Sequence, residues 1–444
     1  MLRRMDSRSV PEATELNGTV TVEPIRVRKH SGKIRGTISV LVKNFQYGGT
    51  QRVLLRLANK LHDYGYAVHV VCPGSGPLET TVCEGIRRIH LEPGSQLHAR
   101  SLVLRASPTA VRQTLLPLVL PLHPVRGIVL LDSLSQYLRH AQPSVLISAT
   151  ASLNVVATLA KRLAKVPTAL VLTEHVTTDQ RRITDRRWAR RYLPALMRFT
   201  YRDADAIVGV STGVSDDLRT LLRVPDERVR CIYNPAVPDN VLSLAGAPLP
   251  HRWFDVDQPP VILSAGRPGR TKDFAMLVRA FARLRKERVV RLVILSSAVP
   301  DTVQSRHLDE LRALANELGV GHDFEILAFT ANPFAYMARA GVFASSSTSE
   351  GFGNVVAEAL ACGCPVVSTR TQGPLEVLEN GRYGRLVPVG DVGAMAQALG
   401  EALRAPRNSA ESVIRASAFS EDRAARAYEA LCCEVGAASE AMSV

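Results

Sequence analysis

Cysteine is scarce in this chain, and its spacing excludes two common uses. The seven cysteines are an odd number, and no two of them have the CxxC spacing. Cys362 and Cys364 are separated by one residue, and Cys432 is followed directly by Cys433. These spacings argue against a disulfide framework and against a zinc site. We therefore expect the cysteines to serve as small buried hydrophobic residues.

Long apolar runs are also missing. No segment approaches the length that a helix needs to span a bilayer, and the charged start Met1–Asp6 has no apolar stretch behind it. We therefore expect no membrane span and no secretory signal, and a cytoplasmic protein. What the chain does have is length: 444 residues, of which 46% are hydrophobic and 22% charged, suffice for two α/β cores.

The formal net charge of +14 favours anionic partners, which are phospholipid surfaces, nucleic acid or phosphorylated substrates. Part of the charge lies in a run from Arg181 to Leu193 that continues to Phe199 and mixes arginines with Trp188 and Tyr192. A membrane-surface helix, a solvated helix face and a nucleic-acid surface all remain open. Aromatic residues beside arginine are typical of the first of these, so an anionic membrane surface is the preferred partner.

A second basic and strongly apolar segment runs from Leu102 to Leu131, with Leu115–Leu122 at its centre. It is too short and too interrupted by proline to span a membrane. It is the second candidate for a membrane-facing surface.

Short apolar runs alternate with helical patterns in two successive series. Residues 1–35 are basic and aperiodic, which predicts a disordered arm. Residues 36–235 predict a first domain, the Pro- and Gly-containing stretch 236–260 a linker, and residues 261–420 a second domain. Residues 421–444 should form a helix and tail that could cross back to the first domain. The runs expected as strands are 37–42, 67–71, 145–148, 168–172, 206–210, 261–265, 291–295, 324–329, 341–344, 365–368 and 385–387.

Strands that alternate with helices predict parallel sheets covered by helices, hence an α/β fold with two similar halves. Ligands of such sheets bind beyond the carboxyl ends of the strands. Two sheets that point these ends at each other would share one cleft.

The most informative stretch of the sequence carries two glutamates around a glycine loop. Glu350 precedes Gly351 and Gly353, Asn354 is a good helix N-cap, and Glu358 follows about one turn into the helix. Such a helix start binds phosphate, and a carboxylate one turn in can accept hydrogen bonds from a pair of sugar hydroxyls. The competing interpretation is a glycine-punctuated crossover with two solvated glutamates.

Two cations follow the first strand of the second half, in Gly266-Arg267-Pro268-Gly269-Arg270-Thr271-Lys272. A loop between a strand and a helix would aim Arg267 and Lys272 into the cleft, where two cations suit a diphosphate. Solvated loop charges are the alternative. No DxD-like pair stands beside a strand end to hold Mg²⁺, so we expect no metal and fixed cations in its place.

The first half offers two weaker candidates. Gly48 and Gly49 precede a helix and allow close backbone approach across the cleft, although paired glycines are equally ordinary in tight turns. His175, in Thr173-Glu174-His175 just past a strand end, is a candidate for orienting a substrate. An ordinary histidine without a role in chemistry is the alternative.

These residues together resemble the retaining glycosyltransferase family 4, also called group 1. The resemblance covers nearly the whole chain after Arg35. Its most specific part is the E-x7-E element from Glu350 to Glu358, followed by Ala-Cys-Gly-Cys-Pro-Val-Val. The resemblance implies the GT-B fold, in which two Rossmann-like domains face each other across a cleft. Three other matches fall in family order: Gly48-Gly49, Asn234-Pro235, and Gly266-Arg267 with Lys272.

The resemblance also implies roles for individual residues. Glu358 would bind the donor ribose, Glu350 would contact the transferred sugar, and Arg267 and Lys272 would hold the donor diphosphate. His175 matches the family's acceptor-side histidine on a short pattern. Backbone N–H groups would reach the donor from Gly351, Phe352, Gly353 and Asn354, with Gly48 and Gly49 approaching from the other domain and Leu327–Thr330 near the nucleobase.

The implied activity is sugar transfer from a nucleotide-sugar donor, expected to be UDP-linked, to a glycan or lipid-linked acceptor at the cytosolic membrane face. No cofactor and no metal are expected. Two alternatives stay open: a catalytically silent GT-B protein that binds membrane or a partner, and a nucleic-acid binder. The first is disfavoured because Glu350, Glu358, Arg267 and Lys272 are all present, and the second lacks a recognition motif.

Overall fold

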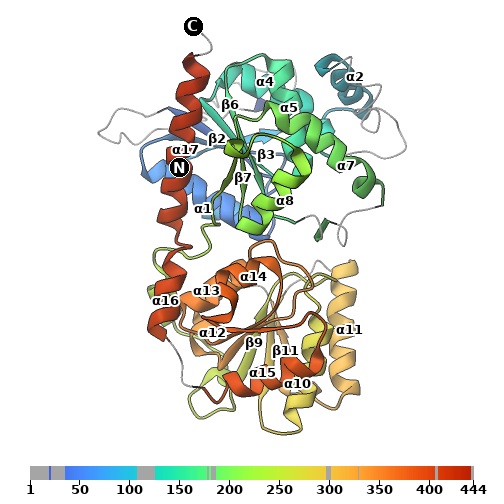
Figure 1. Ribbon diagram of the computed structural model, residues 1–444, viewed down its shortest axis with the longest axis vertical. Helices are drawn as coiled ribbons and strands as arrows, with labels where there is room; N and C mark the ends of the chain where they lie inside the picture. Colours follow the sequence, from blue (N-terminus) through green and yellow to red (C-terminus); the bar gives the residue numbers. More distant parts are fainter. Residues whose placement is uncertain are drawn as a thin grey trace, which may run out of the picture.

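The computed structural model describes residues 20–21, 36–107, 126–177, 180–181, 187–296, 302–328, 330–405 and 409–441. Within these ranges the chain forms two α/β domains, one above the other in Figure 1. The predicted architecture of two parallel sheets with helices is confirmed. Nearly all of the predicted arm 1–35 and the central run Leu115–Leu122 lie outside the described residues.

The N-terminal sheet has the strand order β1-β4-β3-β2-β5-β6-β7-β8. Its pairs are parallel except for β1 with β4, and Ile38 of β2 lies opposite both Val68 of β3 and Val145 of β5. The strand order reverses between β2 and β5, which places the ligand crevice beyond the carboxyl ends of these two strands. The strands are β1 (Val20–Thr21), β2 (Thr37–Leu41), β3 (Ala67–Cys72), β4 (Arg87–Leu91), β5 (Val145–Ala149), β6 (Ala169–Glu174), β7 (Ala206–Gly209) and β8 (Val229–Cys231).

Helices cover both faces of this sheet. Leu54 and Leu61 of α1 belong to the core on one face, and Leu134 of α4 and Val156 of α5 to the core on the other. The helices are α1 (Gly49–Asp63), α2 (Gln96–Ala106), α4 (Leu131–Ala141), α5 (Ala151–Ala164), α7 (Arg187–Thr200) and α8 (Thr212–Leu222), with short 3-10 turns at Pro77–Thr81, Arg126–Leu130, Tyr201–Asp203 and Asp226–Arg228.

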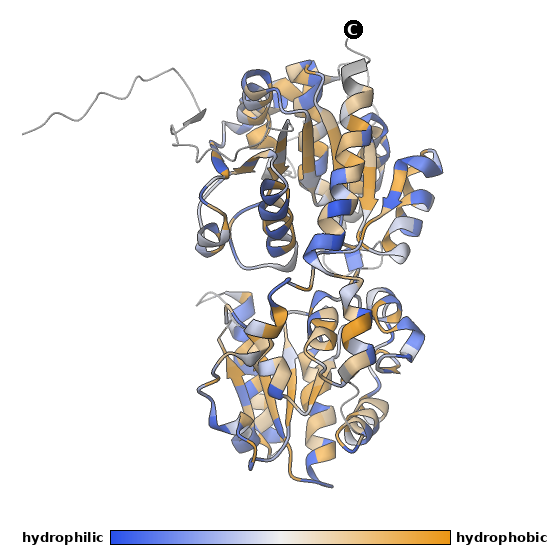
Figure 2. Cartoon of the chain, turned by 90° about the vertical axis from the view of Figure 1, so that its left-hand side faces the viewer, coloured by the Kyte–Doolittle hydropathy of each residue, from blue (hydrophilic) through white to orange (hydrophobic). Residues whose placement is uncertain are grey.

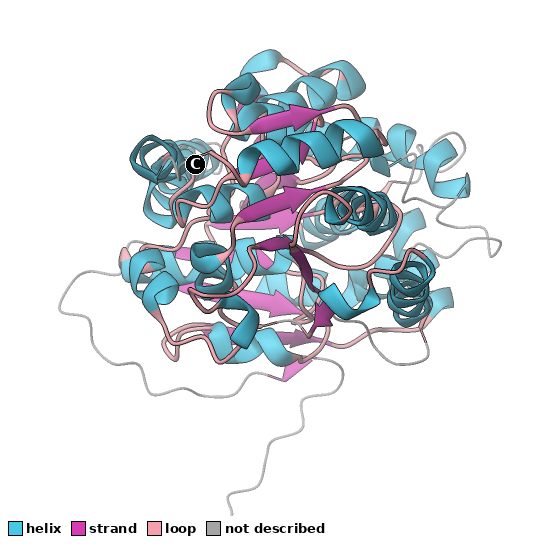
Figure 3. Ribbon diagram, turned by 90° about the horizontal axis from the view of Figure 1, so that it is seen from below, coloured by secondary structure: helices cyan, strands magenta, loops and turns pink. Residues whose placement is uncertain are grey.

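The C-terminal sheet has the order β11-β10-β9-β12-β13-β14, and every pair is parallel. Its order reverses between β9 and β12, so the crevice of this domain lies beyond the ends of those strands. Figure 3 shows its strands enclosed between layers of helices. The strands are β9 (Val261–Ala265), β10 (Arg291–Leu295), β11 (Phe324–Leu327), β12 (Val342–Ser345), β13 (Val366–Thr369) and β14 (Arg385–Val387).

The sequence explains why the covering helices form. In α10 (Phe274–Arg285), Phe274, Leu277 and Phe281 recur at helical spacing and are buried, and the Asp273 carboxylate caps the helix by accepting from the Met276 N–H at 3.2 Å. In Figure 2, orange apolar residues are concentrated on the strands and blue residues on the outer helices. The other helices of this domain are α11 (Val303–Glu317), α12 (Phe334–Arg339), α13 (Asn354–Ala361), α14 (Gln372–Val377), α15 (Val392–Ala402) and α16 (Ser409–Ser417), with 3-10 turns at Gly321–Asp323 and Glu379–Gly381.

The stretch predicted as a linker, 236–260, is packed against the C-terminal domain for most of its length. It forms α9 (Val241–Gly246) and a 3-10 turn at Arg252–Phe254. Asn332 Nδ2 donates to the Leu244 carbonyl at 2.8 Å, and the Arg291 guanidinium lies 4.8 Å from the Trp253 ring centre. Proline and glycine mark the chain turns here, but Phe254 is buried and adds the segment to the core.

The C-terminal helix α17 (Glu421–Ala441) lies on the N-terminal domain, beside α1 in Figure 1. Tyr428 and Leu431 are buried in the same core as the inner face of α1. Where the chain crosses between the domains, the Val237 N–H donates to the Phe419 carbonyl at 3.0 Å, and the Glu421 N–H donates to the Val237 carbonyl at 2.9 Å. Two chain segments therefore connect the domains side by side.

The helix considered for a membrane surface is partly used in packing. Leu196 and Met197 of α7 are buried, and the Arg162 guanidinium lies 4.5 Å from the centre of the Phe199 ring. Phe199 therefore packs within the domain, where Arg162 covers it. In the part of the chain that the structure describes, no helix is long and apolar enough to cross a bilayer.

Candidate functional site

A cleft of about 920 Å³ lies between the two domains, where the carboxyl ends of both sheets meet. It brings together residues that the sequence predicted separately, in the loops after β2, β6, β9 and β12. All the predicted site residues except Gly351 line it: Gly48, Gly49, His175, Arg267, Lys272, Glu350, Phe352, Gly353, Asn354 and Glu358.

Lys272 and Glu350 form an ion pair at the C-terminal wall of the cleft. The Lys272 ammonium lies 2.7 Å from Glu350 Oε2, and Ser347 Oγ donates to the same oxygen at 3.2 Å. Both charged side chains are about one-fifth exposed. The cation and the carboxylate therefore position each other at the edge of the site.

The loop after β9 is shaped around Lys272. Gly266 has φ +153°, and a Cβ placed there would lie 2.9 Å from the Cε atom of Lys272. The positive φ favours glycine here, and a side chain at this position would displace the lysine. Ser346 Oγ donates to the Lys272 carbonyl at 2.7 Å, which ties this loop to the segment after β12.

Arg267 lies in the same loop and is more exposed than Lys272. Its side chain is exposed, and among the described residues its guanidinium has no ion-pair or hydrogen-bond partner. It lines the cleft while remaining available to an anion.

Glu358 lies deeper, on the second turn of α13. It is only 3% exposed, and its Oε2 atom has no hydrogen-bond partner among the described residues. Oε1 lies 3.6 Å from the Arg52 guanidinium, too far for a good hydrogen bond. A buried carboxylate oxygen without a partner costs free energy, so this atom indicates a place for a ligand donor.

The start of α13 differs from the prediction. Asn354 was expected as the N-cap, but it is the first helical residue, and the cap is Gly353 with φ +90° and no capping side chain. Asn354 instead accepts a hydrogen bond from Asn234 Nδ2 at 2.9 Å through Oδ1. Left-handed φ favours glycine, which explains why Gly353 turns the chain and Asn354 does not.

Gly351 approaches the other domain and not the cleft. A Cβ on Gly351 would lie 2.4 Å from the backbone oxygen of His175, so no side chain fits between these two segments. The Gly351 carbonyl accepts a hydrogen bond from Ser211 Oγ at 2.6 Å. The close approach predicted for this glycine is therefore made to protein backbone.

The N-terminal domain contributes the start of α1 to the cleft. Gly48 is the N-cap of α1 and, like Gly353 at α13, brings no capping side chain. A Cβ on Gly49 would lie 3.3 Å from Asn354 Nδ2, so the two helix starts converge. Convergent helix N-termini give a positive potential that suits an anion.

Arg52 and Arg56 of α1 also line the cleft, and sequence reasoning missed both. Arg56 donates to the Ala236 carbonyl at 2.6 Å and lies 3.1 Å from Glu421 Oε1, so it ties α1 to both crossing segments. Burial lowers the pKa of Arg56. The sequence did carry a signal for them: Arg52 and Arg56 are four residues apart in the helix that follows Gly48-Gly49, which places both on one helix face.

His175 lies at the carboxyl end of β6, in the cleft wall. Its Nε2 atom is 3.2 Å from Thr173 Oγ1, and desolvation lowers the pKa of His175 to about 4. The imidazole is therefore neutral at pH 7. A neutral histidine can orient a hydroxyl but carries no charge.

Behind His175 lies a buried carboxylate that the sequence did not reveal. Glu174 is fully buried, and it accepts hydrogen bonds from Asn154 Nδ2 at 3.0 Å, from the Tyr201 hydroxyl and from Arg181. Burial beside Glu174 raises the pKa of Tyr201. Arg181, which begins the basic run, therefore forms an internal ion pair with Glu174.

The predicted nucleobase segment is described only in part. Thr330 lines the cleft, together with Leu295 at the end of β10. Leu327 is half-buried at the end of β11, and Phe329 lies outside the described residues.

Comparison with protein-family models gives two matches that follow the domain order. Residues 47–240 match the family described as Glycosyltransferase Family 4, and residues 259–405 match the one described as Glycosyl transferases group 1. The chain belongs to glycosyltransferase family 4. The resemblance expected from Glu350, Glu358 and their neighbours is confirmed.

Curated family members resemble part of the chain. A 240-residue segment is 34% identical to N-acetylgalactosamine-N,N'-diacetylbacillosaminyl-diphospho-undecaprenol 4-alpha-N-acetylgalactosaminyltransferase of Campylobacter jejuni, covering 52% of this chain and 60% of that protein. A 206-residue segment is 32% identical to the lipopolysaccharide core biosynthesis glycosyltransferase LpsE of Rhizobium meliloti, covering 45% of this chain and 54% of the relative. The matches thus span somewhat more than half the length of these relatives.

Solved structures show the same fold over almost the whole chain. The Anabaena protein HepE, crystallised with UDP and glucose, has a TM-score of 0.70 at 17% identity and covers 90% of this chain and 100% of its own. Sucrose-phosphate synthase from Thermosynechococcus elongatus has a TM-score of 0.72 at 18% identity, covering 91% of this chain and 100% of its own. At such identities the likeness shows the fold alone, and the expected GT-B fold is confirmed.

Proposed function

We propose that the protein is a retaining glycosyltransferase that moves a sugar from a UDP-sugar to a glycan or lipid-linked acceptor in polysaccharide or glycolipid biosynthesis. The observation that carries the proposal is Glu358, a buried carboxylate whose Oε2 atom has no partner among the described residues of the cleft. The hydroxyl pair of a ribose would supply the missing donors. A core carboxylate without this purpose would be costly to keep.

The surroundings of Glu358 suit the rest of a nucleotide sugar. Arg267 and Lys272 provide two cations, and the starts of α1 and α13 provide backbone N–H groups without capping side chains. A diphosphate placed between them would meet positive potential on both sides. The transferred sugar would then lie toward Glu350.

These groups match the charge changes of sugar transfer. Negative charge builds on the leaving diphosphate and positive charge on the sugar ring, so the fixed cations and the Glu350 carboxylate would both lower the barrier. In our proposal the acceptor hydroxyl attacks from the face that the nucleotide leaves, and its proton passes to the leaving diphosphate. His175, neutral at pH 7, would orient that hydroxyl.

The relatives' names support the acceptor class. The Campylobacter protein's name includes diphospho-undecaprenol, and LpsE is named for lipopolysaccharide core biosynthesis. HepE was crystallised with UDP, which supports the choice of nucleotide. We extend the proposal to peripheral attachment at the cytosolic face of a membrane, where a lipid-linked acceptor would be reached.

Replacing Lys272 by Met or Arg267 by Gln tests the proposal. Each change removes one cation facing the leaving group, so turnover should fall by about 10²- to 10³-fold, the loss typical of a group that stabilises transition-state charge. Release of UDP from a panel of UDP-sugars measures it. Unchanged kinetics in both variants would remove these residues from the site.

Metal independence is part of the proposal, because Arg267 and Lys272 would neutralise the negative charge of the diphosphate in place of a metal ion. Turnover should therefore survive an excess of EDTA, and abolition of turnover that Mg²⁺ restores would contradict this assignment. The same assay tests the catalytically silent alternative. If that alternative held, the wild-type protein would bind UDP but would release no UDP from any UDP-sugar.

A further inference from the structure

The loop that carries Glu350 rests on α14. The Gly373 N–H donates to the Glu350 carbonyl at 3.0 Å, and a Cβ on Gly373 would lie 2.3 Å from the Phe352 oxygen. A Cβ on Gly353 would be 3.4 Å from the Pro374 ring. The loop and the first turn of α14 are thus in backbone contact, and a shift of α14 would move Glu350.

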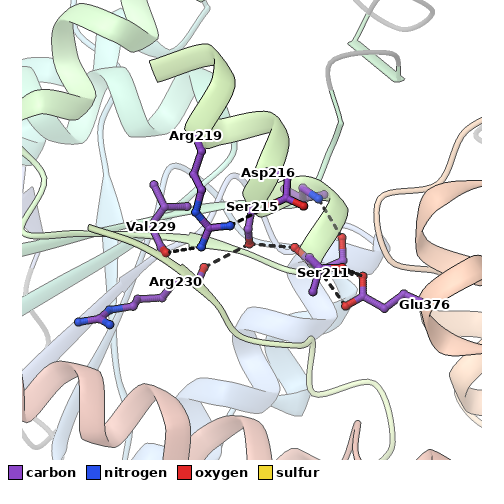
Figure 4. A network of polar contacts seen from close by, with 9 residues as sticks. Ser211, Ser215, Asp216, Arg219, Val229, Arg230 and Glu376 are labelled. Atoms are coloured by element: carbon purple, nitrogen blue, oxygen red, sulfur yellow. Dashed lines mark hydrogen bonds and ion pairs between the residues drawn. The ribbon is translucent and has the colours of Figure 1, made fainter. Parts of the chain in front are cut away.

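The same helix reaches across to the N-terminal domain through Glu376. Both of its carboxylate oxygens accept from the Thr212 N–H, at 3.0 and 2.9 Å, and one of them also accepts from Thr212 Oγ1 at 2.7 Å. Thr212 is the first residue of α8, so Glu376 meets the Thr212 N–H and the positive end of that helix. Figure 4 shows this junction.

The residue before Thr212 holds the loop directly. Ser211 is fully buried, and its hydroxyl donates to the Gly351 carbonyl at 2.6 Å while accepting from the Val214 N–H at 3.1 Å. Ser215 and Arg219 brace the same helix: Ser215 Oγ donates to the Ser211 carbonyl at 2.9 Å, and Arg219 to the Val229 carbonyl at 3.0 Å. The start of α8 is therefore a rigid support.

We propose that Glu376 is a positioning residue, which clasps Thr212 so that the loop bearing Glu350 is in place only when the two domains are closed. The proposal rests on the function proposed above and adds a condition to it. Closure would align Glu350 with the transferred sugar, and the open protein would bind the nucleotide without transferring the sugar efficiently. We call the contacts Glu376–Thr212 and Ser211–Gly351 the interdomain clasp.

The chain offers matched variants for a test. Glu376→Gln keeps the shape of the side chain and removes the charge that meets the start of α8. Glu379→Gln is the control, because Glu379 lies three residues on and pairs with Arg382 at the surface. Thr212→Val removes the hydroxyl and keeps the N–H group, whereas Thr212→Ser keeps both.

We expect Glu376→Gln to lower kcat about tenfold with UDP affinity within about twofold of the wild type, since the interaction acts on the loop and not on the nucleotide. Thr212→Val should lower kcat by a smaller factor, and Thr212→Ser should leave kcat unchanged. The double variant Glu376→Gln/Thr212→Val should be no slower than Glu376→Gln alone, because both changes break the same contact. The assay uses the UDP-sugar that the wild type consumes fastest, with UDP alone as the binding probe. X-ray scattering without ligand should give a larger radius of gyration for Glu376→Gln than for the wild type and Glu379→Gln.

A kcat of Glu376→Gln equal to that of Glu379→Gln would overturn the proposal. So would a lower unfolding midpoint with unchanged kcat per folded molecule, because that is a purely structural role. Failure of the proposed function looks different: the wild type itself would consume no UDP-sugar. The scattering comparison then decides the clasp alone, and equal radii of gyration for both variants would refute it.

Discussion

Two side chains in the cleft are in environments that cost free energy in the folded protein. Glu358 is buried with one oxygen unpartnered among the described residues, and His175 is desolvated with its pKa lowered to about 4. Lys272 and Glu350 satisfy each other and remain partly exposed. Groups in the states of Glu358 and His175 cluster at functional sites, because the free energy that they cost is recovered when a ligand binds.

Replacing Glu358 by Gln should separate binding from stability. The variant removes a buried carboxylate with incomplete hydrogen bonding, which stabilises, and a negative charge beside Arg52 and Arg56, which destabilises, so the midpoint of thermal unfolding should change little. UDP affinity should fall about tenfold, equal to about 1.4 kcal/mol. Calorimetry and thermal unfolding measure the two, with Glu434→Gln on the exposed side of α17 as control. Unchanged UDP affinity would exclude Glu358 from the donor site.

The lowered pKa of His175 predicts a pH dependence of stability. Below its ordinary value of 6.5 the unfolded chain takes up a proton that the folded protein refuses until about pH 4. The unfolded state thus binds more protons in this window, and the free energy of unfolding falls as the pH is lowered. As the pH falls from about 6.5 to 5, the free energy of unfolding should decrease in both proteins. The decrease should be smaller in His175→Gln than in the wild type, by up to about 2 kcal/mol.

Urea unfolding at several pH values measures this difference, with the exposed His140→Gln as control. The slope should be reduced and not abolished in His175→Gln, because burial also lowers the pKa of His69 to about 4. If the free energy of unfolding had the same slope against pH in the wild type and in His175→Gln, His175 would take up its proton as readily in the folded protein as in the unfolded chain.

Secondary-structure elements deliver these side chains to one place. The loops after β9 and β12 supply Lys272 and Glu350, the second turn of α13 supplies Glu358, and the end of β6 supplies His175. Parallel sheets bring the carboxyl ends of their strands to one edge, so loops distant in the sequence become neighbours. The site is a consequence of sheet topology.

Gly351→Ala should disturb the contact between elements of the two domains. The new Cβ would lie 2.4 Å from the His175 backbone oxygen, which cannot yield as a flexible side chain would. The domains should separate slightly, and UDP release should slow at least about tenfold, because groups displaced by an ångström lose much of their effect. Gly74→Ala, which meets no atom within 4 Å, is the control. Equal turnover in both variants would contradict this role.

Local patterns determined how much of this was predictable. Buried strands such as β9 and β10 are continuous apolar runs, and their bounds were predicted within a residue or two. The spacing of Glu350 and Glu358 around a glycine loop singled out both residues, and both line the cleft. The strand β4 was missed because it begins with Arg87 and Arg88 and so lacks a continuous apolar run. Glu376 was missed, as was the contact of Asn234 with Asn354, because these partners lie far apart in the sequence and only the folded chain brings them together.

The whole molecule is two domains joined by two adjacent chain crossings and by the contacts of the clasp. Tyr233, Phe352 and Phe419 meet at this junction with ring centres 5.3 to 5.9 Å apart. Phe352 belongs to the loop that follows Glu350, so this loop is part of the junction between the domains. The net charge of +14 acts at the same scale, since it governs approach to surfaces.

Membrane attachment follows from this charge as a prediction. The protein should cosediment with vesicles containing phosphatidylglycerol at low salt, and less so at high salt, because screening weakens surface attraction. Replacing Arg187 and Arg190 by Gln should reduce binding more than replacing Arg283 and Arg306, which removes equal charge from the C-terminal domain. Absence of binding even at low salt would refute the attachment.

The most direct test of the central claim is a panel of nucleotide-sugars incubated with the purified protein and monitored for release of free nucleotide. We predict that at least one UDP-sugar releases UDP, that EDTA does not prevent it, and that Lys272→Met slows it by about 10²-fold or more. A panel in which no nucleotide-sugar binds or is consumed, by a wild-type protein that is folded, would contradict the account.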